Sequence, residues 1–214
     1  MFLLDGNNTS FWAQLLTTLK QRDTWLFLKI NNDWTNSFLD NNYPWWREAT
    51  TWVPLYFFLL LFVFINFGFK VWPWVVFFAL TLVISDQVSS GILKDWVGRP
   101  RPCNDDVLMS HVHLLLNRCP SSGSFTSSHA TNHFAAACFL FYSMRAYFKK
   151  WGYLFFLWAA TISYGQVYVG VHYPLDIICG AILGCGIGSL TAYIFNKRVG
   201  LPELLIEKNI QIQK

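Results

Sequence analysis

The sequence has few charged side chains. Asp, Glu, Lys and Arg make up 13% of its 214 residues, whereas soluble domains contain roughly 25%. A chain with so little charge cannot cover a water-exposed surface, which excludes a soluble domain, a disordered chain and a coiled coil. The net charge of +4 also excludes a nucleic-acid module with a broad basic face. The composition is instead 54% hydrophobic and 19% aromatic, and it indicates an integral membrane protein.

The apolar residues gather in five runs, at 51–69, 71–93, 133–147, 151–171 and 175–195. Most are close to the ~20 residues that a helix needs to cross the hydrocarbon core. In lipid, only helices and closed barrels satisfy all their backbone hydrogen bonds. The runs do not alternate apolar and polar residues as barrel strands do, so they are predicted to be helices. We therefore predict an all-α membrane bundle of about five transmembrane helices.

The chain divides into three predicted parts: an N-terminal segment (1–48), a transmembrane domain (49–196) with a loop at 94–132, and a cytoplasmic tail (197–214). The N-terminal segment mixes aromatic and charged side chains, which favours amphipathic helices in the membrane interface. A sixth span near 11–28 is the alternative. Basic residues are dense in the short turns and tail of one face, and such segments stay cytoplasmic. The loop is therefore expected to face outward, into the periplasm if this is a bacterial inner membrane.

Two of the five cysteines, Cys103 and Cys119, lie in this outward loop. An oxidising compartment would join them, so we predict a disulfide between them. The alternative is a metal site formed with His111 and His113, but this spacing fits no standard zinc pattern.

Three polar clusters, at 94–102, 124–129 and 166–176, fall at helix ends on the outward face. Lys94 and Arg101 offer charges that match phosphate oxygens. Ser127 and Ser128 begin the third helix, whose free N–H groups and dipole favour an anion. Together these features predict a phosphate-binding site.

The same clusters contain the groups that phosphoryl transfer requires. Pro174 is a natural first residue for the fifth helix, so Asp176 lies in the first turn and can reach back to His172. A carboxylate on one ring nitrogen leaves the other nitrogen free as a nucleophile or base. His129 is a candidate general acid for the leaving oxygen.

Lys94-x6-Arg101-Pro102, Ser127-x-His129 and His172-x3-Asp176 resemble the three motifs of the type-2 membrane phosphatidic acid phosphatases. These enzymes are relatives of bacterial acid phosphatases and vanadium haloperoxidases. The resemblance covers roughly residues 50–195 and agrees in order, spacing and membrane placement.

The resemblance also implies residue roles. Lys94, Arg101 and Ser127 would bind phosphate, His172 would form a phosphohistidine, Asp176 would orient it, and His129 would protonate the leaving group. The family needs no metal. Its members dephosphorylate lipids such as phosphatidate, phosphatidylglycerophosphate, undecaprenyl pyrophosphate and lipid A. A lipid-phosphate binding or translocating protein and a lipid phosphotransferase are the alternative functions.

Two departures from the family pattern matter. Ser128 stands where the family usually has Gly, which still leaves a backbone N–H. Gly165 and Gln166 stand where the family usually has Ser-Arg, so one phosphate-binding guanidinium is missing. Gln166 can still donate a hydrogen bond to phosphate, and Arg99 and His133 are the candidates to compensate. We also expect that Gln166→Arg does not raise turnover, because the pocket has repacked around the amide.

Two features inside the helices have supporting interpretations. Asp86 lies two turns before Lys94 on roughly the same face, which predicts a supporting pair. Gly180, Gly184 and Gly188 repeat every four residues and predict close helix packing.

Overall fold

A computed structural model describes residues 11–201 of the chain. The predicted tail beyond residue 201, and the first ten residues of the N-terminal segment, lie outside this range. The helices are α1 (Phe11–Leu28), α2 (Ser37–Trp46), α3 (Val53–Phe67), α4 (Trp72–Asp86), α5 (Lys94–Val97), α6 (Ser128–Ser143), α7 (Arg145–Phe148), α8 (Tyr153–Tyr168) and α9 (Pro174–Arg198). A π-helical segment, η4 (Gln87–Leu93), connects α4 to α5. The described residues contain no β-strand, and the predicted all-helical membrane fold is confirmed.

Within the described residues, three stretches are long and apolar enough to cross a membrane: Ala49–Phe67, Phe69–Asn104 and Pro174–Arg198. They cover all or most of three of the five predicted runs. The other two runs correspond to α6 and α8, of 16 residues each. The total of five spans therefore stays a prediction. The α6 helix starts at Ser128, where the sequence predicted it, five residues before the apolar run at 133–147. Polar side chains of its first turns such as Thr131 are buried in the bundle.

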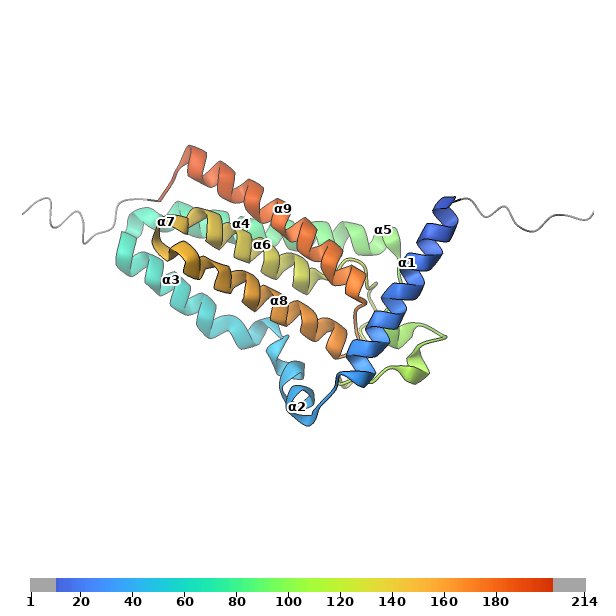
Figure 1. The fold of residues 1–214 in the computed structure, drawn as a ribbon. Helices are drawn as coiled ribbons and strands as arrows, with labels where there is room; N and C mark the ends of the chain where they lie inside the picture. Colours follow the sequence, from blue (N-terminus) through green and yellow to red (C-terminus); the bar gives the residue numbers. More distant parts are fainter. Residues whose placement is uncertain (1–10, 202–214) are drawn as a thin grey trace, which may run out of the picture.

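The α6 helix lies at the centre of the bundle and packs against α9, α8 and α4 (Figure 1). Its contact with α9 depends on the predicted glycine stripe. A Cβ atom on Gly184 would collide with the backbone oxygen of Thr131, and one on Gly188 would collide with that of Ala135. The two backbones therefore approach each other as closely as glycine permits. This packing fixes the start of α6 beside the start of α9.

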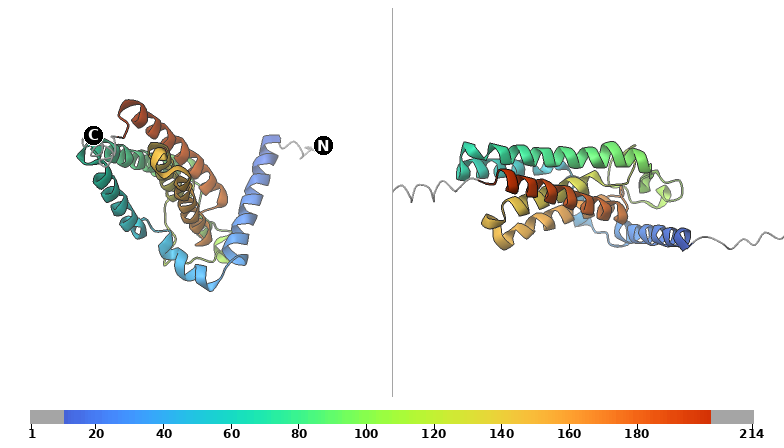
Figure 2. Two further views of the ribbon diagram at one scale, coloured as in Figure 1. Left: turned by 60° about the vertical axis from the view of Figure 1, so that its left-hand side comes forward. Right: turned by 90° about the horizontal axis from the view of Figure 1, so that it is seen from above.

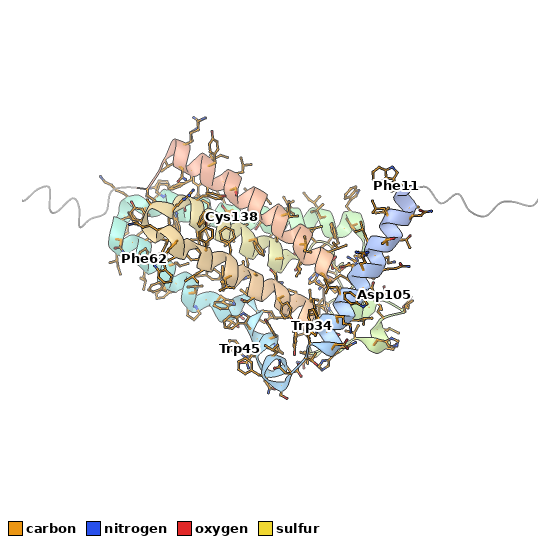
Figure 3. All side chains as sticks on the ribbon, viewed as in Figure 1. Phe11, Trp34, Trp45, Phe62, Asp105 and Cys138 are labelled. Atoms are coloured by element: carbon orange, nitrogen blue, oxygen red, sulfur yellow. A yellow bond between two sulfur atoms is a disulfide. The ribbon has the colours of Figure 1, made fainter. Side chains whose placement is uncertain are left out.

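The polar clusters meet at one end of the bundle. The starts of α6 and α9, the end of α8, and α5 with the loop after it all lie at this end in Figure 1. The α1 helix lies across the same end, and α2 continues from it toward α3 (Figures 1 and 2). Trp34 and Trp45 are exposed here (Figure 3), as interfacial aromatic residues are.

This placement agrees with interfacial N-terminal helices and gives no support to a sixth span, since α1 is not among the apolar candidate spans. The interfacial location itself stays a prediction.

The loop between α5 and α6 is closed by a disulfide between Cys103 and Cys119, with their Cα atoms 5.9 Å apart. The predicted pairing is confirmed, and it uses the two thiols that the alternative metal site needed. Arg101 precedes the first cysteine by two residues, and Ser122 follows the second by three. The disulfide therefore holds together the two ends of the loop that reach the site.

Candidate active site

His172 lies in the short connection between α8 and α9 and is only 2% exposed. Its Nδ1 atom is 3.5 Å from Oδ2 of Asp176, one turn into α9. The same carboxylate oxygen accepts a hydrogen bond from the backbone N–H of Tyr173 at 2.9 Å, which completes a capping box. The predicted reach of Asp176 back to His172 is therefore present, although the contact is longer than a tight hydrogen bond. Catalytic contacts are often long without substrate.

Arg101 lies on the other side of the His172 ring and is 5% exposed. Its Nη1 atom is 3.1 Å from Nε2 of His172 and 3.1 Å from the carbonyl oxygen of Val171. Its remaining hydrogen bonds go to the backbone and side chain of Ser122. Because a guanidinium can only donate, Nε2 must accept and the proton sits on Nδ1, facing Asp176. The lone pair of Nε2 thus points to the cation that would hold a phosphate.

The environment keeps the His172 imidazole neutral. Burial is the main cause, and it lowers the pKa of His172 to about 4, with Arg101 acting in the same direction and Asp176 opposing both. A neutral imidazole is the nucleophilic form of histidine.

Arg99 forms a bridge and does not compensate for the missing guanidinium. It donates to Asp176 at 2.8 Å and to Asp23 of α1 at 2.6 Å, and it lies over the ring of Tyr173. Asp23 also accepts from the backbone N–H of Leu175. Both carboxylates are almost fully buried, so this ion network is committed to holding α1 against the start of α9.

Lys94 is a half-buried cation at the start of α5, and its side-chain ammonium makes no hydrogen bond or ion pair among the described residues. Its charge interacts with those of Arg101, Asp86 and Asp176. The expected partner Asp86 makes no ion pair with it, because that carboxylate accepts instead from Asn132 and Ser90. Lys94 is therefore uncommitted, as a phosphate-binding lysine must be.

The start of α6 is organised for an anion. Ser127 is the N-cap, and its hydroxyl accepts from the N–H of Ala130, while the N–H groups of Ser128 and His129 make no hydrogen bond among the described residues. Free N–H groups at a helix start are anion-binding groups. The hydroxyl of Ser128 accepts from Ser89 of η4 and keeps its own proton to donate.

The two histidines of α6 have different surroundings. The His129 side chain is partly exposed and has no hydrogen-bond partner among the described residues. His133 donates to the carbonyl of His129 at 2.8 Å, and its ring meets Trp158 edge-on. His133 therefore supports His129 from one turn further along α6, and its buried Nε2 atom has no hydrogen-bond partner among the described residues.

Gln166 is fully buried near the end of α8, and its backbone carbonyl oxygen accepts hydrogen bonds from the backbone N–H groups of Val171 and His172. Its side chain contacts Arg47, which the sequence analysis missed. Arg47 Nε donates to Gln166 Oε1 at 3.0 Å. A basic residue just before the first apolar run is typical of an interfacial anchor, so the sequence contains no signal that places Arg47 at the site.

The described site thus combines a neutral buried histidine, a carboxylate, buried cations and a free helix start at one end of a membrane bundle. Fold and site together define an integral membrane enzyme of the lipid phosphatase class. The model of the PAP2 superfamily matches residues 70–199, and the chain belongs to this superfamily.

Two similar proteins are named lipid A 4'-phosphatase. The one from Bacteroides thetaiotaomicron is 36% identical over 86% of this chain and 81% of its own length. The one from Porphyromonas gingivalis is 28% identical over 79% of this chain and 71% of its own length.

Two solved structures have a similar fold. Aquifex aeolicus LpxE has a TM-score of 0.57 and 27% identity, covering 79% of this chain and 94% of that one. The PAP2-type phosphatidylglycerolphosphate phosphatase of Bacillus subtilis has a TM-score of 0.61 and 20% identity, covering 85% and 88%. The second likeness shows the fold alone.

Proposed function

We propose that this membrane lipid phosphatase hydrolyses a phosphate ester of a lipid A-type glycolipid through a phosphohistidine on His172. The observation that supports the proposal most directly is the position of Nε2, 3.1 Å from a guanidinium nitrogen of buried Arg101. A phosphate bound to that guanidinium would have its phosphorus atom next to the nucleophile.

In the first step, the Nε2 lone pair attacks phosphorus and the bond from phosphorus to the ester oxygen breaks. Lys94, Arg101 and the hydroxyls of Ser127 and Ser128 stabilise charge on the non-bridging oxygens, together with the free N–H groups of α6. His129 gives its proton to the leaving alkoxide. Asp176 stabilises the positive charge that develops on the His172 ring.

In the second step, water attacks the same phosphorus atom while His129 removes its proton. The phosphorus–nitrogen bond breaks, and its electron pair returns to Nε2 of His172. Inorganic phosphate is released and the site returns to its starting state.

The substrate class rests on the relatives. Two relatives of which this chain covers more than two thirds are named for the 4'-phosphate of lipid A. Their names, and the sugar-borne phosphomonoester that they imply, favour lipid A over the other lipid phosphates that the family accepts.

We place the site on the periplasmic face of the bacterial inner membrane. The end of the bundle with the site also holds the disulfide, which forms in oxidising compartments. The basic turn around Arg145, Lys149 and Lys150 lies at the opposite end, as a cytoplasmic turn would.

The test is phosphate release by the purified protein from a panel containing lipid A, phosphatidate, phosphatidylglycerophosphate and undecaprenyl pyrophosphate. Labelled substrate and an alkaline quench, which preserves phosphohistidine, then trap the phosphoenzyme. We expect release from lipid A, labelled protein in the wild type and no label in His172→Ala. His111→Ala, in the exposed part of the loop, is the matched control and should behave as the wild type.

The alternatives give different results. A binding or translocating protein would bind the lipid without phosphate release or labelled protein. A phosphotransferase would pass the label to a second lipid instead of to water. Hydrolysis without label on the protein would contradict the histidine intermediate while leaving the phosphatase activity intact.

A further inference from the structure

The family usually has an arginine at the position of Gln166, and this chain lacks it. A guanidinium from another part of the chain lies in the same neighbourhood. Arg47 ends α2, outside the residues matched by the family model. It lies 119 positions before Gln166, yet its Nε atom bonds directly to that amide. Arg47 is only 6% exposed, which is unusual for an arginine beside the membrane interface.

The pairing needs an amide at position 166. Arginine can only donate, so the amide oxygen must face Arg47 and the amide nitrogen must point elsewhere. That nitrogen is fully buried and has no hydrogen-bond partner among the described residues. An arginine at 166 offers no acceptor and would repel Arg47. The neutral Gln166 side chain therefore allows the positive charge of Arg47, from the end of α2, to lie beside the third motif.

Arg47 is also electrostatically part of the site. Its charge acts on Arg101 and on His129. An open cavity of about 570 Å³ is lined by Arg47 and Glu48 on one side and by Arg118 and Ser122 on the other, and Ser122 is the residue that holds Arg101.

The donors of Arg47 are only partly used. Nη1 is paired with Glu48 and Nε with Gln166, whereas Nη2 makes no hydrogen bond within residues 11–201. Arg47 shares its charge only with the half-exposed Glu48, and Arg101 has no carboxylate partner among the described residues. These guanidiniums repel one another and are electrostatically unfavourable until a further anion binds between them. The charge distribution is that of a polyanion site without its ligand.

We propose that Arg47 is a second phosphate-binding guanidinium of this enzyme beside Arg101, supplied from the end of α2 in place of an arginine at position 166, and that Gln166 orients it. The unpaired amide nitrogen of Gln166 adds a neutral donor to the same phosphate. The proposal rests on the proposed function, because it assigns a further residue to the same substrate phosphate. It also explains why Gln166→Arg alone should not raise turnover.

The experiment exchanges the two positions. Four variants are compared with the wild type: Arg47→Ala, Arg47→Lys, Gln166→Arg and the double variant Arg47→Ala/Gln166→Arg. The measurements are kcat/KM for phosphate release, inhibition by orthovanadate as a mimic of the transferred phosphoryl group, and Tm. Arg145→Ala removes an exposed arginine at the opposite end of the bundle and is the matched control.

We expect Arg47→Ala to lower kcat/KM by about 100-fold, the usual loss for one preorganised donor to the transition state. Vanadate affinity should fall in parallel. Arg47→Lys should retain an intermediate affinity, because it keeps the charge but loses the fork. Gln166→Arg alone should lower activity, and the double variant should recover at least tenfold over Arg47→Ala. Arg145→Ala should match the wild type.

A purely structural role for Arg47 gives another pattern. Tm would fall, while vanadate affinity of the folded fraction would stay within threefold of the wild type, and the double variant would recover nothing; that result overturns the proposal. If Arg47→Ala does not fold, vanadate affinity of Arg47→Lys decides, and an unchanged value counts against the proposal. If the wild type releases phosphate from no lipid, the proposed function fails, but vanadate binding still tests Arg47.

Discussion

At the scale of single residues, the site depends on the charge state of a few buried groups. His172 is held between Arg101, which can only donate to it, and Asp176, which can only accept. Burial and the nearby guanidinium keep the ring neutral, so no separate base is needed to prepare it. Protonation of this ring would both remove the nucleophile and place a third positive charge beside Arg101 and Lys94.

The pKa of His172, about 4 in the folded protein, predicts a pH dependence of stability. The unfolded chain binds a proton on this histidine below its ordinary pKa of about 6.5, whereas the folded protein does not. Stability is therefore fully present above about pH 6.5 and is lost as the pH falls toward 4, by about 3 kcal/mol in total. Tm measured over this range should fall more steeply for the wild type than for His172→Asn.

Activity should depend on the same titration. Above pH 4 the ring is already neutral, so loss of its nucleophile should appear in kcat/KM only near pH 4. A fall of kcat/KM on the acid side near pH 6.5 would contradict this prediction if a substitution of a charged residue beside His172 shifted its midpoint.

At the scale of elements, the site is assembled from helix ends that other contacts fix. The α1 helix contributes Asp23, which joins Arg99 and the backbone of Leu175 at the start of α9. Arg99 in turn joins Asp176, the carboxylate beside His172. An N-terminal helix outside the three motifs thereby helps to hold the carboxylate that we propose orients the nucleophile.

Asp23→Ala should therefore reduce both stability and turnover. It leaves Arg99 with half of its ionic partners and the N–H of Leu175 without an acceptor, and breaking a buried pair costs about 3 kcal/mol. Tm and kcat should both fall. Lys29→Ala breaks the exposed pair of Lys29 with Asp33 on the next segment and serves as the control, with little change expected in either quantity. Equal effects of the two substitutions would show that α1 is held by general packing.

The contact between α6 and α9 supports a sharper comparison. Gly184→Ala should push the two helices apart, because its Cβ would meet the backbone of Thr131, which cannot move aside. Gly186→Ala, two residues along the same helix, has open space and exchanges Gly for a better helix former. We expect a lower Tm and lower kcat for the first and an unchanged or higher Tm for the second.

At the scale of the whole molecule, the site lies at the end of the bundle where several long-range connections meet. The disulfide closes the loop between the first two motifs and holds Arg101 near Ser122. Two other connections, α1 to α9 and α2 to α8, reach the same end from the N-terminal segment. The opposite end consists of short turns and an aromatic core around Phe67, Trp74 and Phe139.

Removal of the disulfide should therefore affect both stability and phosphate binding. For a loop of this size the chain-entropy model predicts a loss of about 3 kcal/mol. Cys103→Ser/Cys119→Ser should lower Tm and weaken inhibition by vanadate, because Arg101 loses the constraint on its neighbours. A reductant should change the wild type in the same way and leave the double serine variant unaffected. Mass mapping that finds both thiols free in the native protein would contradict the pairing itself.

The sequence alone determined the features that local chemistry encodes. Scarce charge and apolar runs required membrane helices. The spacing of Lys94 and Arg101, and of His172 and Asp176, predicted which groups gather at the candidate site. His172 lies two residues before the helix that carries Asp176 in its first turn, and Arg101 follows the short helix that begins with Lys94. The two cysteines of the polar loop predicted its disulfide.

Only the tertiary structure decided which further residues contact the groups of the site. Arg99 was a candidate phosphate ligand by proximity in sequence, but its charge is consumed by Asp23 and Asp176. Arg47 had no motif to mark it, and its position depends on how α2 packs against α8. The physical reason is the same in both cases. A side chain's partner across the bundle is set by helix packing and by burial of charge, and neither of these is contained in the spacing along the chain.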